Sequence, residues 1–235
     1  MTRRILRREL LKIDGRAVEL NVKLNPRARR LIVKVHPTSG EVMVVAPSKR
    51  ALDRAMDFAR GQSDWIARQL AKVPARVTLE PGARLPFQGT DHLIVRAERG
   101  PVTVEDGMIH VAGLNAHLPR RILDFLKKQA KRALEQRSFE FAARLGVKPR
   151  RISVRDNASR WGSCSSTRSL SFSWRLILAP PFVLDYVVAH EVAHLKEMNH
   201  GARFWRIVSE LIGEATPAQT WLRQHGAALH RYAVK

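Results

Sequence analysis

Three histidines and a glutamate near the C-terminal end of the chain have the types and spacing of a metal site. His190-Glu191-Val192-Ala193-His194 is an H-E-x-x-H pattern, and His200 follows six residues after the second histidine. Residues four apart lie on one face of an α-helix, so His190 and His194 can reach the same ion. Three protein ligands leave a fourth position for water, which is typical of catalytic rather than structural zinc. The pattern therefore predicts one Zn²⁺, or another divalent metal, per chain.

Glu191 is the expected catalytic carboxylate of this site. It lies about 100° around the helix from His190, off the metal but close enough to hold a metal-activated water. Its predicted role is to take a proton from that water and return it to the leaving group. The residue that assists at the developing oxyanion is left open between four candidates, Asn157, Arg160, Tyr186 and Arg203.

The helix that carries the motif is predicted to be buried. Leu184, Val188, Val192 and Leu195 form one apolar face, and Val183 and Val187 flank the histidines on the other. A helix that is apolar nearly all round lies in a core, where two neighbouring histidines need partners. Metal ligation supplies such partners. The proline pair at 180–181 predicts where this helix begins.

The segment before this helix alternates strictly, which predicts a half-buried strand over Leu170–Leu178. Its apolar side chains share one face, and serines such as Ser171 share the other. Because the strand leads directly into the motif helix, we expect it to line the cleft and to pair with an extended peptide. Ser171 is therefore a candidate substrate-binding residue.

The stretches "SRWGSCSSTRSLSFSWRLILAP" and "HEVAHLKEMNHGARFW" resemble the YgjP-like predicted zinc metallopeptidases, which are zincin relatives of the SprT/Spartan and WLM-type proteases. The resemblance implies that His190, His194 and His200 hold zinc and that Glu191 is catalytic, the same four residues that the spacing indicates. The histidine spacing also equals that of metzincins. Glu197 stands where metzincins have glycine, so the chain is not assigned to that class.

The pattern along the rest of the chain indicates an α+β fold. Strands are expected within residues 16–46, a single helix over about 50–71, further short strands up to about 113, and a long helix from Pro119 to Gly146. This division predicts a β-rich N-terminal region with one helix, residues 1–117. A zincin-like metal-binding catalytic region would follow, residues 118–235, with the motif helix next to a small antiparallel sheet.

The charge of the chain indicates which partners it can attract. It holds 42 Lys and Arg against 21 Asp and Glu, a formal net charge of +21. Residues 1–50 and residues 120–155 each carry a net +9. Such fields attract nucleic acid or nucleotides, although a solvated basic face gives the same composition.

Composition also narrows the class of protein. Hydrophobic residues make up 45% of the chain, which argues against disorder, and no apolar run reaches the length of a membrane span. The N-terminus has no apolar signal segment, and the single cysteine, Cys164, excludes an internal disulfide. A cytoplasmic location without membrane association is the expectation, and the sequence gives no indication of oligomeric state.

The leading functional prediction is a zinc metallopeptidase that acts on a peptide or protein substrate. One alternative is a nucleotide phosphohydrolase that releases pyrophosphate from nucleoside triphosphates, because a metal-activated water attacks phosphorus as well as carbon. The other is a nucleic-acid-associated protein with a structural zinc. The presence of Glu191 beside three ligands argues against that second alternative, because a closed structural site has no use for a carboxylate there.

Overall fold

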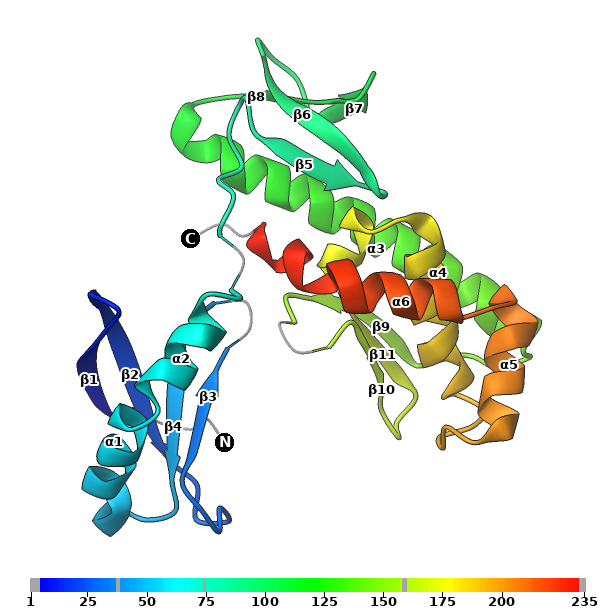
Figure 1. The fold of residues 1–235 in the computed structure, drawn as a ribbon. Helices are drawn as coiled ribbons and strands as arrows, with labels where there is room; N and C mark the ends of the chain where they lie inside the picture. The colour runs from blue at the N-terminus through cyan, green and yellow to red at the C-terminus, as the bar shows by residue number, and fades with distance from the viewer. Residues whose placement is uncertain (1–4, 37–38, 74, 158–159, 233–235) are drawn as a thin grey trace. The chain divides into compact units, whose positions relative to one another are not determined.

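The computed structural model describes residues 5–36, 39–73, 75–157 and 160–232, and the chain divides into two compact units, residues 1–75 and 76–235 (Figure 1). Helices and strands occur in both, so the α+β class is confirmed. The division comes earlier than the boundary expected at 117/118. The physical reason is that the strands after residue 83 share a core with the long helix that follows them, as the burial of Leu85, Ile94 and Ile109 with Ile122 and Leu126 shows.

The first unit is a four-stranded sheet packed against two helices. Its strands pair in the order β1-β2-β4-β3, with β2 and β4 parallel and the outer pairs antiparallel. The core is apolar and completely buried, for example at Leu20, Val44 and Met56. The elements are β1 Ile5–Ile13, β2 Arg16–Leu24, β3 Ile32–Val35, β4 Val42–Ala46, η1 Lys49–Ala51, α1 Leu52–Arg60 and α2 Ser63–Leu70.

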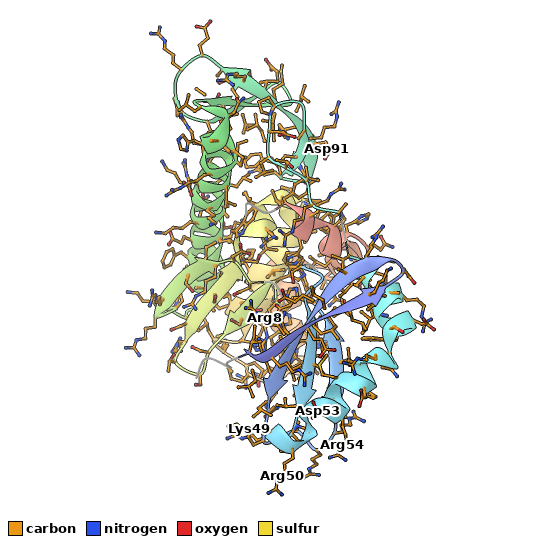
Figure 2. All side chains as sticks on the ribbon, turned by 90° about the vertical axis from the view of Figure 1, so that its left-hand side faces the viewer. Arg8, Lys49, Arg50, Asp53, Arg54 and Asp91 are labelled. Atoms are coloured by element: carbon orange, nitrogen blue, oxygen red, sulfur yellow. The ribbon has the colours of Figure 1, made fainter. Side chains whose placement is uncertain are left out.

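Two features of this unit differ from the sequence-based expectation. The single helix expected over 50–71 is wrong, because the helical run is interrupted at Gly61 and Gln62, where glycine costs about 1 kcal/mol relative to alanine. Strand β1 was not expected, because its charged residues mask the alternation. The basic side chains of Lys49 and Arg50 project from η1, and that of Arg54 projects from the first turn of α1 (Figure 2).

The second unit begins with a sheet that repeats the topology of the first. Its strands pair in the order β5-β6-β8-β7, again with one parallel pair in the middle. Gln88 and Gly89 both have positive φ in the β5–β6 turn, as a type I′ hairpin requires. The strands are β5 Arg84–Phe87, β6 Thr90–Ala97, β7 Thr103–Glu105 and β8 Met108–Ala112.

The long helix α3, Leu118–Arg144, follows a short 3-10 turn, η2 Asn115–His117, and confirms the helix expected from Pro119. Its buried residues recur every three or four positions, for example Ile122, Leu126 and Ala130. Just past the helix, Gly146 has a φ of 65°, as expected for a helix stop. Arg137 of α3 donates two hydrogen bonds of 2.6 Å to Asp185, which ties this helix to the motif helix.

The third sheet precedes the motif helix and has the order β10-β11-β9. Strands β10 and β11 are antiparallel, but β11 and β9 are parallel. The chain reverses direction between β9 and β10 and again between β10 and β11, so β9 and β11 run the same way. The sheet is therefore mixed rather than purely antiparallel. Its strands are β9 Arg151–Arg155, β10 Gly162–Cys164 and β11 Ser169–Ser173.

The strand expected over Leu170–Leu178 is wrong in its second half. Residues Trp174–Leu178 form a 3-10 helix, η3, that is buried on all sides, including Arg175. Because every side chain of this 3-10 helix is buried, an alternating sequence pattern cannot distinguish it from a half-buried strand. The β5–β6 hairpin packs on η3, where Gly89 donates its N–H to the Leu178 carbonyl. A Cβ at Gly89 would lie 2.8 Å from Pro180, so glycine allows this close approach at the start of the motif helix.

The C-terminal part of the chain is helical and contains the motif. The helices are α4 Pro181–Ala193, α5 Ala202–Ile212, α6 Thr216–His225 and η4 Gly226–Arg231. Helix α4 begins at Pro181, as expected, and nine of its residues are buried, which confirms that it is a core helix. Within the described residues, no helix has both the length and the apolar character needed to cross a membrane.

Candidate metal centre

The three histidines of the motif meet at the C-terminal end of α4. His190 lies in the last turn of α4, His194 is its C-cap residue, and His200 returns after a short turn just before α5. One ring nitrogen from each lies within 4.8 Å of the other two. Nε2 of His190 and Nε2 of His200 lie 3.1 Å apart.

This arrangement fits a zinc ion. Tetrahedral zinc with Zn–N bonds of about 2.0–2.1 Å holds its ligand nitrogens roughly 3.3 Å apart. The donor set is also suitable, because it offers three imidazole nitrogens. The nitrogen of His190 that converges with the others is Nε2, whereas its Nδ1 is buried and has no hydrogen-bond partner among the described residues. His190, His194 and His200 are therefore the residues that could hold the metal.

One ligand has an orienting partner that the sequence did not identify. Nδ1 of His194 lies 3.1 Å from the backbone carbonyl of Glu197, which leaves its Nε2 for the metal. Phe204 of α5 is fully buried beneath the cluster, with ring centroids 4.6–4.9 Å from those of the three histidines. The position of this phenylalanine relative to the histidines depends on how α5 packs on α4, so the sequence alone could not identify it.

The environment favours the neutral, metal-binding form of His190 and His194. Burial, reinforced by the nearby His194 and His200, lowers the pKa of His190 to about 4. Burial also lowers the pKa of His194, partly offset by the Glu197 carbonyl and reinforced by His200. Neutral imidazole is the metal-binding state, so the site is prepared for a cation.

Glu191 packs against strand β10, next to Gly162. Its carboxylate accepts a hydrogen bond from the backbone N–H of Cys164 and lies in the field of Arg160. Burial dominates over both and raises the pKa of Glu191 to about 7. A carboxyl group with a pKa near neutral pH is suited to general acid–base catalysis.

Gly162 makes room for this carboxylate, which sequence reasoning missed. A Cβ on Gly162 would lie 2.6 Å from Oε1 of Glu191, closer than any side chain allows. The signal in the sequence is a glycine inside a strand, which often marks a close approach. Cys164 itself stays a thiol, because burial and the charge of Glu191 raise its pKa to about 11. That value argues against a nucleophilic role for Cys164.

The other candidate residues lie in different places around the centre. Asn157, Arg160 and Ser171 line a groove of about 460 Å³ over the third sheet. Tyr186 lines an apolar pocket of about 220 Å³ together with His190 and Glu191, and its hydroxyl accepts a hydrogen bond from Gln219. Arg203 is exposed on α5, with its Nε 3.9 Å from Oε2 of Glu197. Only Tyr186 of the five shares a pocket with both His190 and Glu191.

The strand that can receive a peptide differs from the one expected. Strand β11 is the middle strand of its sheet, with β10 on one side and β9 on the other. Substrate pairing with β11, as expected from the sequence, is therefore wrong, since both of its edges are occupied. Strand β10 is the edge strand next to Glu191.

Comparison with known proteins gives one family and one structural likeness. No curated protein matches the chain. The crystal structure of the metallopeptidase zymogen of Pyrococcus abyssi abylysin aligns with a TM-score of 0.36 and 18% identity, over 39% of this chain and 93% of that chain. The model of the family described as YgjP-like, metallopeptidase domain, matches residues 29–225, which include all four residues of the motif. The chain belongs to the YgjP-like metallopeptidase domain family.

Proposed function

We propose that this protein is a zinc-dependent peptidase in which Glu191 is the general base. The observation that carries the proposal is the juxtaposition of three convergent imidazole nitrogens with a buried carboxylate whose pKa is raised to about 7. A structural site needs only the ligands, whereas the carboxylate has a use only if a water is activated beside it.

The residues of the chain divide the chemistry between them. His190, His194 and His200 would hold the metal, which when bound supplies a Lewis acid that acidifies water and polarises a carbonyl. Glu191 takes the proton of the attacking water and passes it to the leaving amine. Tyr186 is the proposed oxyanion donor, because its hydroxyl accepts from Gln219 and so keeps its own proton free to donate.

Strand β10 is the proposed docking edge for the substrate backbone. Ser173 donates its N–H to Trp161, and Ser165 donates to Ser169, so the alternation of the antiparallel pair turns the backbone groups of Gly162 and Cys164 away from β11. The Cys164 N–H donates to Glu191, so the groups proposed to pair with substrate are those of Gly162 and the Cys164 carbonyl. An extended peptide that paired there would lie beside Glu191. The apolar pocket with Trp161, Tyr186 and Leu222 would receive one of its side chains.

The phosphohydrolase alternative is favoured by one observation. The groove beside the centre is lined by Arg151, Arg155 and Arg160, with serines between them, and these groups suit phosphate oxygens. The experiment that tests the peptidase must therefore include both peptides and nucleoside triphosphates as substrates.

The test is hydrolysis by the zinc-loaded protein of a panel of unfolded protein, peptides and nucleoside triphosphates, with Glu191→Gln and Glu214→Gln beside it. Glu214 is exposed and outside the centre, so its variant controls for the loss of one carboxylate. We expect peptide cleavage that falls by about 10³-fold or more in Glu191→Gln alone. Glu191-dependent release of phosphate or pyrophosphate with peptides intact would instead support the phosphohydrolase. A zinc-containing protein with no activity on any substrate would favour the structural role.

A further inference from the structure

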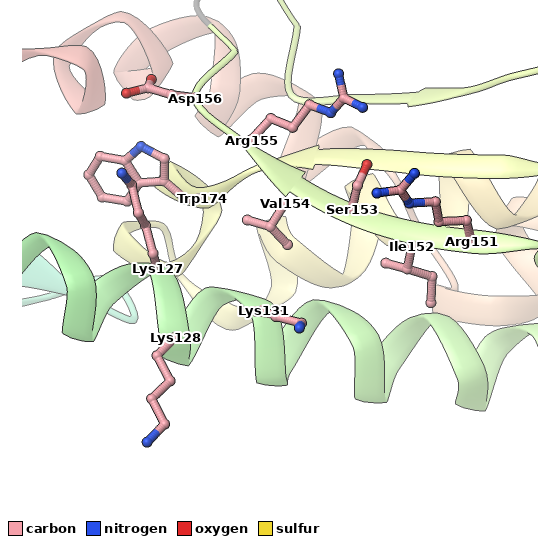
Figure 3. A pocket seen from close by; sticks show the side chains of 10 residues that line it. All are labelled: Lys127, Lys128, Lys131, Arg151, Ile152, Ser153, Val154, Arg155, Asp156 and Trp174. Carbon is pink, nitrogen blue, oxygen red and sulfur yellow. The ribbon is translucent and has the colours of Figure 1, made fainter.

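A basic cleft lies between helix α3 and strand β9, outside the metal centre. It has a volume of about 560 Å³, and none of the histidines or Glu191 lines it. Figure 3 shows Lys127 and Lys131 of α3 between the helix and β9, with Lys128 pointing away from the strand. Arg151 and Arg155 stand on the face of β9 that is turned away from α3. The five cationic residues, here called the cleft cations, are Lys127, Lys128, Lys131, Arg151 and Arg155.

The charge of the cleft cations is largely uncompensated. Within the described part of the chain, only Lys131 has a carboxylate within 4 Å, that of Glu135 at 3.9 Å. The one acidic residue of the cleft, Asp156, pairs with Arg175, a buried arginine with 4% exposure, and its charge also acts on Lys127. The other four cleft cations have no carboxylate within 4 Å among the described residues, so they repel one another in the folded state, which favours the binding of an anionic ligand.

The positive surface continues from this cleft to the metal centre. Arg151, Ser153 and Arg155 line both the cleft and the 460 Å³ groove on the other side of β9. That groove also contains Arg160, whose charge acts on Glu191. A ligand with many negative charges can therefore follow one continuous basic track.

We propose that the α3–β9 cleft binds the phosphodiester backbone of a nucleic acid. Arg151 and Arg155 lie four residues apart on a strand, about 13 Å, so the cations are spread along a line that suits a polyanion better than a single phosphate. The only aromatic side chain in the cleft, Trp174, is 1% exposed and offers no stacking surface for a base. Binding should therefore rest on phosphate contacts and be independent of sequence.

The direct test is fluorescence anisotropy of labelled 20-nucleotide DNA and RNA, single- and double-stranded, with the full chain. The triple variant Lys127→Gln/Lys128→Gln/Lys131→Gln is compared with Arg84→Gln/Arg99→Gln/Arg206→Gln, which removes three exposed positive charges elsewhere. We expect the cleft variant to lose about tenfold or more in affinity and to reduce the salt slope by roughly 2–3, at ~0.7–0.9 per phosphate contact. The control variant should change affinity less than threefold.

Three outcomes would overturn the proposal: no binding by the wild type, equal losses in the two triple variants, or displacement by poly-glutamate as effective as that by unlabelled oligonucleotide. The last outcome would assign the cleft to an acidic polypeptide instead.

Lysine acetylation of the wild type gives a second measurement that does not depend on the folding of a variant. Bound oligonucleotide should protect Lys127, Lys128 and Lys131 but leave the exposed Lys196 reactive. This inference stands apart from the proposed peptidase activity, because the lysine variant should cleave a short neutral peptide as the wild type does.

Discussion

At the scale of single residues, the close contact between Gly162 and Glu191 determines where the Glu191 carboxylate can lie. Gly162→Ala would place a methyl group 2.6 Å from the carboxylate, so Glu191 must shift. We expect kcat on a peptide to fall about 10–100-fold, because a displacement near 1 Å costs this much in positioning. Bound zinc, measured by atomic emission, should stay at one per chain, since the histidines are untouched.

A matched control for this change is Gly61→Ala, where a Cβ would meet only atoms at 3.6 Å in ordinary contact. Gly61 also has a φ of −64°, which alanine adopts without strain. If both variants kept full activity, Glu191 would not need its present position and the proposed base would be wrong.

The raised pKa of Glu191 makes a prediction about stability as a function of pH in the metal-free protein. The unfolded carboxyl ionises near pH 4.5 and the folded one near 7, so the folded state holds a proton that the unfolded state has lost between these values. The contribution of Glu191 to the free energy of unfolding is therefore full below pH 4.5 and falls as pH rises towards 7. At ~1.4 kcal/mol per pH unit the loss is about 3 kcal/mol.

Glu191→Gln removes this ionisation while keeping the size of the side chain. At pH 8 we expect the metal-free variant to melt roughly 6–12 °C above the metal-free wild type, at ~2–4 °C per kcal/mol for a chain of this size. At pH 4.5 the two melting curves should nearly coincide. A variant less stable than the wild type at pH 8 would show that the carboxylate is not buried in an unfavourable charged state.

Some parts of the metal centre could be predicted from the sequence and others could not. The meeting of His190 and His194 follows from helical spacing alone, and His200 is close in sequence, so local geometry is enough to predict the cluster. Gly162, Phe204 and the Glu197 carbonyl act on these residues across other elements. Their roles depend on how β10 and α5 pack on α4, for which no short pattern exists.

At the scale of secondary-structure elements, the prediction to test is that a substrate peptide pairs with strand β10. If a substrate peptide pairs with its free edge, replacing one substrate amide beside the scissile bond by an ester removes an N–H donor and should cost about 0.5–1.5 kcal/mol, roughly 2–10-fold in kcat/KM. The same replacement several residues away should have no effect. Equal rates for all ester positions would contradict pairing at β10, and this test leaves the enzyme unaltered.

The elements themselves were predictable where burial follows one face. Helix α3 matches its expected range because its apolar residues keep one helical stripe, from Leu118 to Phe141. The segment Trp174–Leu178 was mistaken for strand because it is enclosed on every side, so its alternation carried no information about which face is buried. Likewise β1 was missed because Arg7, Arg8 and Glu9 interrupt its apolar pattern.

At the scale of the whole molecule, the chain uses one sheet topology twice. The orders β1-β2-β4-β3 and β5-β6-β8-β7 share their parallel and antiparallel pairs, and each sheet is followed by helix. The first sheet packs with α1 and α2 in a core of its own, and the second joins the core that contains α3 and α4. All residues assigned to the metal centre belong to the second unit.

This separation of cores predicts that residues 76–235 alone fold and bind one zinc ion. The buried cluster from Leu79 to Tyr232 includes no residue of the first unit, so its apolar contacts remain when that unit is removed. We expect a single cooperative melting transition, raised by zinc, and peptide cleavage within about threefold of the full chain. The family model begins at residue 29, inside the first unit, so the opposite result is informative. A fragment that binds zinc but no longer cleaves peptide would assign the first unit a part in substrate binding, whereas a fragment that fails to fold would show that the two cores are not independent.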